Sequence, residues 1–219
     1  GGMNDTVGSL EGMGAVSIGF GGFLAVGRDN SSTAFGGVIG GSGAFQKVGG
    51  GTLTLAGTNT YLGPTRLSEG TLLVQGTIAS SSALHLNFPL PTSNAFPAVL
   101  GGNGFVSALA PSPGGIIAPG ASPGQLSVQG AANLADTELR IELNGTLPGV
   151  GYDQLRAAAG VSLNNTRLVV TSGFEPTTND TFTILEKTSA GLISGAFLNL
   201  PEGSILSSGP QQYRITYVG

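Results

Sequence analysis

Three segments of this chain share one pattern, in which an apolar residue precedes x-Gly-x-Gly and two further apolar residues follow. They are Leu10–Val16, Ile39–Phe45 and Leu100–Val106, and their first residues lie 29 and 61 positions apart. Glycine supplies 39 of the 219 residues, well above the roughly 7% that is usual. Because glycine destabilises a helix interior but accepts the positive φ of tight turns, the pattern predicts short strands that end at turns.

The residues between the glycines alternate with the period of a strand. In Thr52–Leu55 the leucines fall on one side and the threonines on the other. Glu138–Leu143 alternates in the same way, with an apolar set of Leu139, Ile141 and Leu143 opposite a charged set of Glu138, Arg140 and Glu142. The best candidate for a helix is Leu155–Val161, which Gly160 interrupts. We therefore expect an all-β fold.

Two all-β plans fit these strands, a sandwich of hairpins and a solenoid of stacked coils. A strand that ends at glycine recurs as Leu72–Gly76 and Leu126–Gly130, with Leu53–Gly57 as a looser copy. Irregular repeats with small residues at the turns favour the solenoid. We expect a stack of short parallel strands from about Gly8 to Gly149.

Charge and cysteine content exclude several classes of partner. Only 9% of residues are charged, the net charge is −4, and no basic stripe exists to neutralise phosphates or to bind an anionic membrane. Residues 70–135 carry no charge, but Gly, Pro, Ser, Thr and Asn interrupt them too often for a membrane span. The absence of cysteine suits an exported protein. Residues 1–7 lack the features of a signal peptide, so we expect a mature product or an excised fragment.

The segment Ile39–Gly76 carries a family resemblance. Its residues 47–61 read Lys-Val-Gly-Gly-Gly-Thr-Leu-Thr-Leu-Ala-Gly-Thr-Asn-Thr-Tyr, and the segment resembles the passenger-associated β-strand repeat of bacterial autotransporters. Ala118–Gly130 resembles the "PGxSPGxLxVxG" element that commonly follows this repeat. The blocks Tyr152–Leu155, Phe182–Leu185, Gly195–Phe197, Leu200–Gly203 and Tyr213–Tyr217 resemble the closing section of such passengers.

This resemblance implies a right-handed parallel β-helix with a C-terminal capping section. Residues 1–150 would form the β-solenoid coils, and residues 151–219 would form further coils and an autochaperone-like cap. The resemblance also implies export across the outer membrane of a Gram-negative bacterium, display at the cell surface or release, and a translocator barrel outside these residues. From the charge, composition and motifs we expect no cofactor, no nucleic-acid partner and no direct membrane insertion.

Two patterns suggest nucleophilic catalysis, and both have simpler explanations. Gly120–Gly124 has the G-x-S-x-G form of a nucleophile elbow, but Pro123 follows the serine and has no N–H for an oxyanion hole. A tight turn explains the segment better. His85 is the only histidine, and it alternates with Leu84 and Leu86, which predicts an outward-facing surface side chain.

The remaining patterns also favour a chain without catalytic or metal sites. Glu138 and Glu142 would stand roughly 13 Å apart on one strand, farther than the roughly 5–9.5 Å of a glycosidase pair. Gly36–Gly37 and Gly49–Gly51 lack the Lys-Ser/Thr of a phosphate-binding loop. The acidic residues are scattered and form no motif for calcium. We expect no enzyme activity.

Three functions remain open. The first is a structural stalk that also contributes to adhesion. The second is a module that binds a glycan or the surface of a host or neighbouring cell, through a loop at 87–97 that carries Phe88, Asn94 and Phe96. An aromatic content of 6% with no tryptophan disfavours a sugar platform. The third is a polysaccharide-cleaving β-helix enzyme, which the site residues disfavour.

The C-terminal third differs in composition from the rest. Residues 152–219 hold five of the twelve acidic residues and three of the four tyrosines. Longer strands are predicted at Arg167–Thr171, Thr181–Glu186 and Tyr213–Val218. Because an uncovered solenoid end leaves unpaired backbone groups and an open core, these features predict a stable cap from which folding spreads toward the N-terminus.

Overall fold

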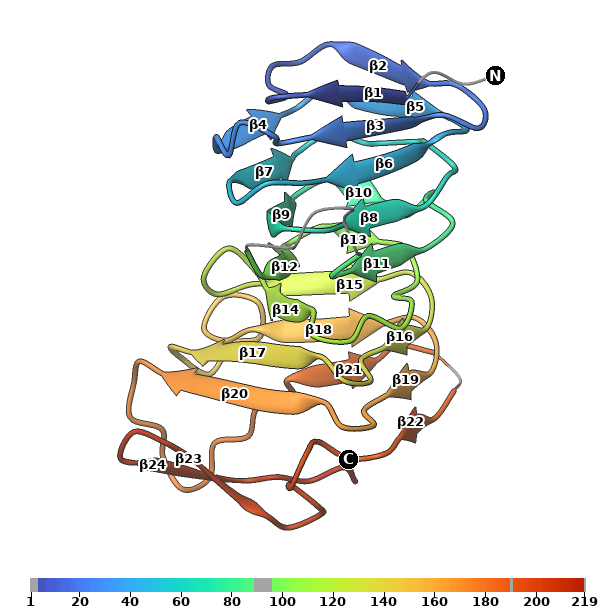
Figure 1. Cartoon of the computed structure of the whole chain (residues 1–219). Coiled ribbons are helices and arrows are strands. Elements are labelled where there is room, and N and C mark those ends of the chain that lie inside the picture. Colours follow the sequence, from blue (N-terminus) through green and yellow to red (C-terminus); the bar gives the residue numbers. More distant parts are fainter. Residues whose placement is uncertain (1–3, 89–95, 190, 219) are drawn as a thin grey trace.

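A computed structural model describes residues 4–88, 96–189 and 191–218, and these residues form strands and turns without an α-helix. Successive coils stack along one axis to give a parallel β-helix, with the N-terminus at one end and the C-terminus at the other (Figure 1). The prediction of a stack of parallel strands is confirmed. Within the described ranges, no helix long and apolar enough to cross a membrane is found.

The coils present three faces, which we call A, B and C. Face A contains β1 (Asn4–Val7), β3 (Phe23–Val26), β6 (Ala44–Lys47), β8 (Thr65–Leu67), β11 (Leu84–Leu86), β16 (Ala132–Asn133), β19 (Val161–Ser162) and β22 (Ile193–Ser194). A single bridging residue, Leu109, joins β11 to β16. Face B contains β4 (Thr33–Phe35), β7 (Thr52–Leu55), β9 (Gly70–Val74), β12 (Ala98–Gly102), β14 (Ile116–Pro119), β17 (Glu138–Leu143) and β20 (Arg167–Ser172).

Face C begins with β2 and β5 and continues, after a bridge at Thr58, through five further strands. These strands are β2 (Ala15–Ile18), β5 (Val38–Gly41), β10 (Thr77–Ile78), β13 (Phe105–Val106), β15 (Gln125–Val128), β18 (Gln154–Ala157) and β21 (Leu185–Lys187). All strand pairs on the three faces are parallel. The one antiparallel strand pair in the described residues is the hairpin β23 (Ile205–Ser208) and β24 (Gln211–Arg214) at the C-terminal end.

The coils lengthen along the chain. The register pairs Asn4 with Phe23, a step of 19 residues, whereas it pairs Val161 with Ile193, a step of 32 residues. The repeated x-Gly-x-Gly units therefore do not mark the coil period. The units at 10–16 and 100–106 turn from face B to face C, whereas the unit at 39–45 turns from face C to face A. Glycine recurs in these units because each unit spans a corner between two faces.

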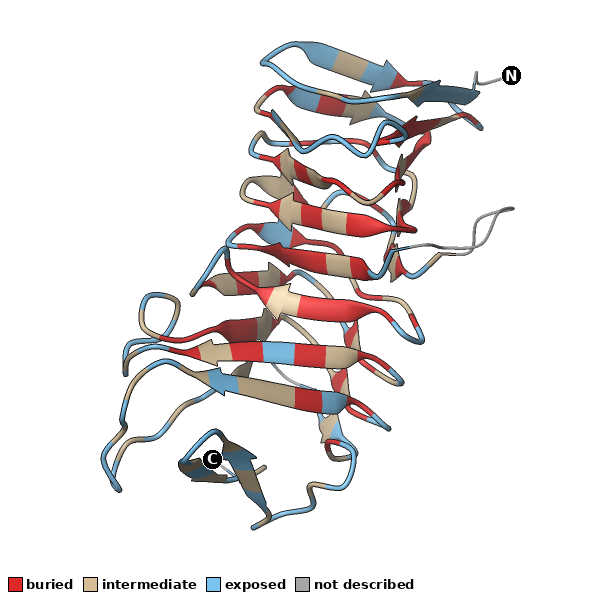
Figure 2. Cartoon of the chain, turned by 60° about the vertical axis from the view of Figure 1, so that its left-hand side comes forward, coloured by how far each residue is buried: buried red, intermediate tan, exposed pale blue. Residues whose placement is uncertain are grey.

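The core consists of side chains stacked in register from coil to coil. One inward column on face B is at most 6% exposed throughout and consists of Leu53, Leu72, Leu100, Ile117, Leu139 and Leu168. Buried and less buried residues alternate along several strands, as Figure 2 shows. Since neighbouring strands lie about 4.8 Å apart, each leucine contacts the equivalent residue above and below it.

The corner between faces A and B has a recurring conformation. Seven successive coils place a residue with φ between +51° and +76° there, namely Asn30, Gly49, Gly70, Asn87, Gly114, Asp136 and Asn165. Asn, Asp and Gly adopt this left-handed conformation more readily than other residues do. The corner therefore explains why these residue types recur between the strands.

Two of the long C-terminal strands predicted from the sequence are wrong. In Thr181–Glu186 only the last two residues belong to β21, because the N–H of Thr183 donates to the Tyr152 hydroxyl instead of to a strand. In Tyr213–Val218 the strand ends at Arg214, and the N–H of Tyr217 donates to the Glu202 carboxylate. The predicted strand Arg167–Thr171 is confirmed as β20.

The inward column predicts that two adjacent residues of β12 contribute very differently to the free energy of unfolding. Leu100 is fully buried, so Leu100→Ala should lower the free energy of unfolding by about 2–5 kcal/mol. Val99 faces outward and is partly exposed, so Val99→Ala should lower it by less than about 1 kcal/mol. Urea unfolding of the two variants measures the difference, and equal losses would contradict the register.

Candidate functional site

The predicted recognition loop at 87–97 is anchored on face A by its first aromatic residue. The Phe88 ring lies 4.8 Å from the Arg66 guanidinium carbon and meets the His85 ring edge-on at 6.3 Å. Phe96 is 46% exposed, and its ring covers the corner at Gly50, where an added Cβ would lie 2.9 Å from ring atoms. Asn94 lies outside the described residues. Both phenylalanines therefore pack on neighbouring coils at the base of the insertion.

His85 points outward, as the sequence predicts. Leu84 and Leu86 are buried on either side of it, and Arg66 occupies the equivalent position on the preceding coil. Partial burial, and then the charge of Arg66, lower the pKa of His85. The imidazole is therefore neutral at pH 7, beside an aromatic ring and a cation.

The G-x-S-x-G segment forms a turn between β14 and β15, as predicted. Ser122 has a φ of +85°, and its hydroxyl donates to Glu142 Oε2 at 2.6 Å. A strand follows the turn, where a nucleophile elbow has a helix. The hydroxyl is thus bound to a carboxylate on the next coil, so it holds two coils together.

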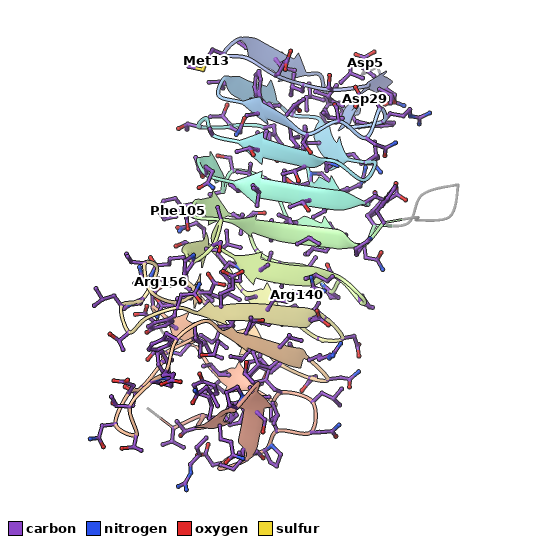
Figure 3. The ribbon with its side chains drawn as sticks, turned by 90° about the vertical axis from the view of Figure 1, so that its left-hand side faces the viewer. Asp5, Met13, Asp29, Phe105, Arg140 and Arg156 are labelled. Atoms are coloured by element: carbon purple, nitrogen blue, oxygen red, sulfur yellow. The ribbon has the colours of Figure 1, made fainter. Side chains whose placement is uncertain are left out.

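A shallow depression of about 340 Å³ lies on face B beside this turn. Gly101 and Ala118, which have small side chains, lie among its lining residues and leave room there. Its polar lining residues include Ser122, Arg140, Glu142 and Asp153. Arg140 is seen near the middle of the stack in Figure 3. The depression contains no aromatic residue. Each of its charged side chains already has a partner: Arg140 pairs with Glu138, Glu142 accepts from the Ser122 hydroxyl, and Asp153 accepts from backbone N–H groups.

Asp153 connects the turn to the strand β17. The side chain is 3% exposed, and its two oxygens accept the N–H groups of Gly124 at 2.7 Å and of Glu142 at 2.8 Å. Burial, with a contribution from the nearby charge of Glu142, raises the pKa of Asp153 to about 6, although the two N–H groups act in the opposite direction. Asp153 lies in the block Tyr152–Leu155, but no role was predicted for it from the sequence. Its two N–H partners lie 29 and 11 residues away in the sequence, so no local pattern revealed them.

The charged set on β17 faces solvent, as predicted from its alternation. Glu138 accepts from Arg140 Nε at 2.5 Å and from Arg167 on the next coil at 2.9 Å. The two arginine side chains are 50% and 68% exposed, so each pair contributes at most about 1 kcal/mol to stability. This arrangement suits a solvated surface.

Lys47 is a buried cation that the sequence analysis missed. It occupies an inward position of face A between Val26 and Leu67 and is 0% exposed. Its Nζ donates to the carbonyls of Val48, Gly49 and Glu69 at 2.7, 2.7 and 3.3 Å. Burial lowers the pKa of Lys47 to about 8, and the charge of Glu69 opposes this shift. Sequence alternation places Lys47 inward but does not reveal that its ammonium group reaches the carbonyls of the next two residues and of Glu69, 22 residues away.

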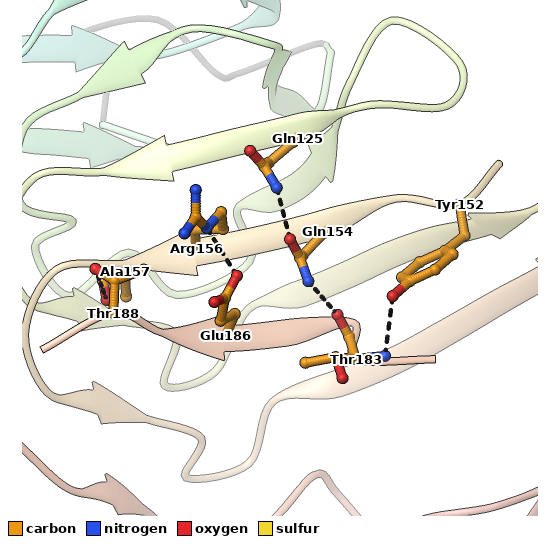
Figure 4. A network of polar contacts seen from close by, with 8 residues as sticks. All are labelled: Gln125, Tyr152, Gln154, Arg156, Ala157, Thr183, Glu186 and Thr188. Atoms are coloured by element: carbon orange, nitrogen blue, oxygen red, sulfur yellow. Dashed lines mark hydrogen bonds and ion pairs between the residues drawn. The ribbon is translucent and has the colours of Figure 1, made fainter. Parts of the chain in front are cut away.

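Aromatic rings and a polar network join the last coils. The Phe182 ring meets the rings of Tyr152, Phe174 and Tyr213 edge-on at 5.4, 5.9 and 6.1 Å. On face C, Gln125 donates to Gln154, and Gln154 donates to the carbonyl of Thr183 (Figure 4). Arg156 pairs with Glu186 at 2.7 Å in the same region. These contacts cross three consecutive coils.

Within the described ranges, His, Asp and Glu side chains form no cluster of three or more that could hold a metal ion. The polar groups described above connect coils to one another.

Comparison with known proteins agrees with the resemblance carried by residues 39–76. Residues 45–74, from β6 to β9, match the family described as the passenger-associated-transport-repeat. A segment of 90 residues, 41% of this chain, is 38% identical to the extracellular serine protease of Serratia marcescens. The matched part is 8% of that protein, so the chain corresponds to a small portion of its length.

The buried carboxyl of Asp153 predicts a pH-dependent stability. Because its pKa is raised in the folded state, the folded state binds this proton more tightly than the unfolded state does. Its contribution should therefore fall by about 1–3 kcal/mol as the pH rises from below 4 to above 6. Asp153→Asn should remove this slope, whatever its effect on absolute stability.

The measurement is urea unfolding at intervals between pH 3.5 and 7. Glu175→Gln, which removes an exposed carboxylate, serves as the matched control and should keep the slope of the wild type. A slope unchanged in Asp153→Asn would show that Asp153 does not have this raised pKa.

Proposed function

We propose that this chain is a non-catalytic β-helical segment of a surface-displayed or secreted autotransporter-type protein. One observation carries the proposal. The strands of face B pair in unbroken register from β4 to β20, and the matched repeat at 45–74 lies within this stack. In such a segment the stack acts as a stalk that holds other parts of the protein at a distance.

The stack has the physical properties of a rigid spacer. Each coil is hydrogen-bonded to its neighbours along three faces, and the inward columns bury leucine against leucine. Bending the stack would open backbone hydrogen bonds on one face, which is unfavourable. The passenger repeat and the extracellular relative support a location outside the cell. Display on a Gram-negative outer membrane, through a translocator barrel outside these residues, is part of the proposal.

The proteolytic activity in the relative's name is not transferred to this chain. The match covers 8% of the relative, and the only histidine here, His85, contacts Arg66 and Phe88. The Ser122 hydroxyl is bound to Glu142. We propose that this part of such proteins carries the stalk and that catalysis, where present, belongs to other segments.

Residues 151–219 are proposed to close the stack and to seed its folding. The hairpin β23–β24 crosses the C-terminal end with an antiparallel pairing. Its Ser208 hydroxyl accepts the N–H of Ser172 at the end of β20, and the Tyr213 hydroxyl donates to Ser172 Oγ. The N–H and the hydroxyl of Ser172, which could otherwise bond to a further coil, are thus bonded to the hairpin.

A second candidate function is binding to a glycan or to a host or neighbouring-cell surface at the base of the insertion. Phe96 is 46% exposed, and the described residues place no carboxylate in an ion pair with Arg66. An exposed aromatic ring and an arginine are common in recognition sites. Adhesion through this region would be compatible with the stalk.

Truncation tests the role of the C-terminal section. A fragment of residues 1–151 loses β18 to β24 and exposes the inward columns, so it should aggregate or remain unfolded. A fragment of residues 38–219 keeps the C-terminal section and should fold. Circular dichroism and thermal unfolding compare the two. Cooperative folding of residues 1–151 with a stability near that of the full chain would contradict the capping role.

A glycan array and a hydrolase screen on the purified chain separate the stalk from the alternatives. We expect no hydrolysis of polysaccharide or peptide. If the second candidate is correct, glycan binding should fall at least tenfold in the double variant Phe88→Ala, Phe96→Ala. Phe105→Ala, which removes a 48% exposed ring on face C, is the matched control. Hydrolysis that is abolished by changing a single Asp, Glu or His would overturn the non-catalytic assignment.

A further inference from the structure

The chain contains two Asn-Gly pairs, Asn103–Gly104 and Asn144–Gly145. In such a pair the backbone nitrogen of the glycine can attack the side-chain amide of the asparagine, because glycine has no Cβ to obstruct the approach. Each pair follows a strand of face B and lies at the corner that leads to face C. Both asparagines are exposed. Sequence and exposure therefore do not distinguish the two pairs, but their hydrogen bonds do.

The first pair is held by the coils on either side of it. The N–H of Gly104 donates to the carbonyl of Val74, on the preceding coil, at 2.8 Å. Asn103 Oδ1 accepts the N–H of Gln125, on the following coil, at 3.0 Å. The glycine nitrogen and the asparagine amide are thus each bound to a different coil. Both bonds must open before the two groups can react with each other.

The second pair has no such bonds. Within the part of the chain that the structure describes, the N–H of Gly145 donates to no acceptor, and the Asn144 side chain makes no hydrogen bond. The Asn144 amide lies against Gly173 on the next coil, where an added Cβ would be 2.2 Å from Asn144 Oδ1. This neighbour has no side chain, so the amide is held there by contact with backbone alone.

The loop that contains the second pair is closed by its own hydrogen bonds. The N–H of Asn144 donates to the carbonyl of Gly151 at 2.7 Å, and the carbonyl of Leu147 accepts the N–H groups of Gly151 and Tyr152 at 2.7 and 3.1 Å. Leu147 is 65% exposed, so the loop projects from the stack. None of these bonds uses the N–H of Gly145. Its nitrogen can therefore react without the opening of a strand pair.

We propose that Asn144 is a site of self-modification, at which the folded chain converts its own asparagine to an acidic residue. The Gly145 nitrogen forms a bond to Asn144 Cγ, the bond between Cγ and Nδ2 breaks, and the amide nitrogen leaves as ammonia with the proton of the Gly145 N–H. Water then opens the cyclic imide at one of its two carbonyls. The products are aspartate and isoaspartate, and water is the only co-reactant.

The modification changes both the charge and the backbone of this corner. Either product adds one negative charge to a chain whose net charge is −4. Isoaspartate also routes the main chain through Cβ, which lengthens the loop by one atom. Because β17 ends at Leu143, the added atom lies outside the strand pairs. We therefore expect a modified chain that keeps its stack and carries an altered loop.

The test follows both pairs in the full 219-residue chain by peptide mass spectrometry during incubation at pH 8. In the folded chain Asn144 should be converted roughly tenfold or more faster than Asn103, because the two hydrogen bonds of the first pair must open first. In the urea-unfolded chain the two rates should be similar. No conversion at Asn144, or equal rates in the folded chain, overturns the proposal. A difference that persists in urea would show that the structure does not cause it, and overturns the proposal too.

Two variants test the chemistry itself. Asn144→Gln keeps an amide but would need a six-membered ring, so the acidic form of the chain seen by ion-exchange chromatography should no longer accumulate. Gly145→Ala should slow its accumulation several-fold, because the added Cβ obstructs the attack; Gly145 does not have the positive φ that favours glycine. If Gly145→Ala disturbs the loop, Asn144→Gln decides alone. An acidic form that accumulates in Asn144→Gln at the rate of the wild type overturns the proposal.

Discussion

The stacking of equivalent apolar side chains in adjacent coils is the interaction on which the rest of the structure depends. A single coil cannot bury its own inward leucines, because each strand is only two to six residues long and has a neighbour only above and below. Leu72 is buried because Leu53 and Leu100 lie in register with it. Stability is therefore a property of neighbouring pairs of coils, and every corner must return the chain to the same register.

The corners meet this requirement through backbone conformation and through a few buried polar groups. The corner between faces A and B uses a left-handed residue in successive coils, which fixes the direction of the chain without a long loop. Two buried charged groups, Lys47 and Asp153, are bound to backbone groups from more than one segment. A shift in register would leave the charged group or its backbone partners buried without a hydrogen bond, so these contacts favour the observed register.

Local features of the fold could be predicted from the sequence, and long-range ones could not. The alternation in residues 138–143 correctly predicted which side chains face inward, because the period of a strand is a local property. The coil period could not be obtained from the x-Gly-x-Gly units, because these mark corners, and different corners have similar sequences. The predicted strand at Thr181–Glu186 was wrong because the Tyr152 hydroxyl, from the preceding coil, binds the N–H of Thr183. The binding of Asp153 to Gly124 and Glu142, and of Lys47 to Glu69, was missed for the same reason, since these partners lie on other coils.

The C-terminal section differs in its hydrogen bonding from the coils before it. At the C-terminal end the hairpin β23–β24 runs antiparallel, and Tyr213 and Ser208 bind groups of Ser172. We propose that these bonds, with the aromatic contacts of Phe182, replace those of a further coil and make this section the most stable part of the stack. Because each coil of a solenoid is stabilised by its neighbours, a coil that forms beside this section finds an edge with which to pair. We therefore expect folding to spread from the C-terminal section toward the N-terminus.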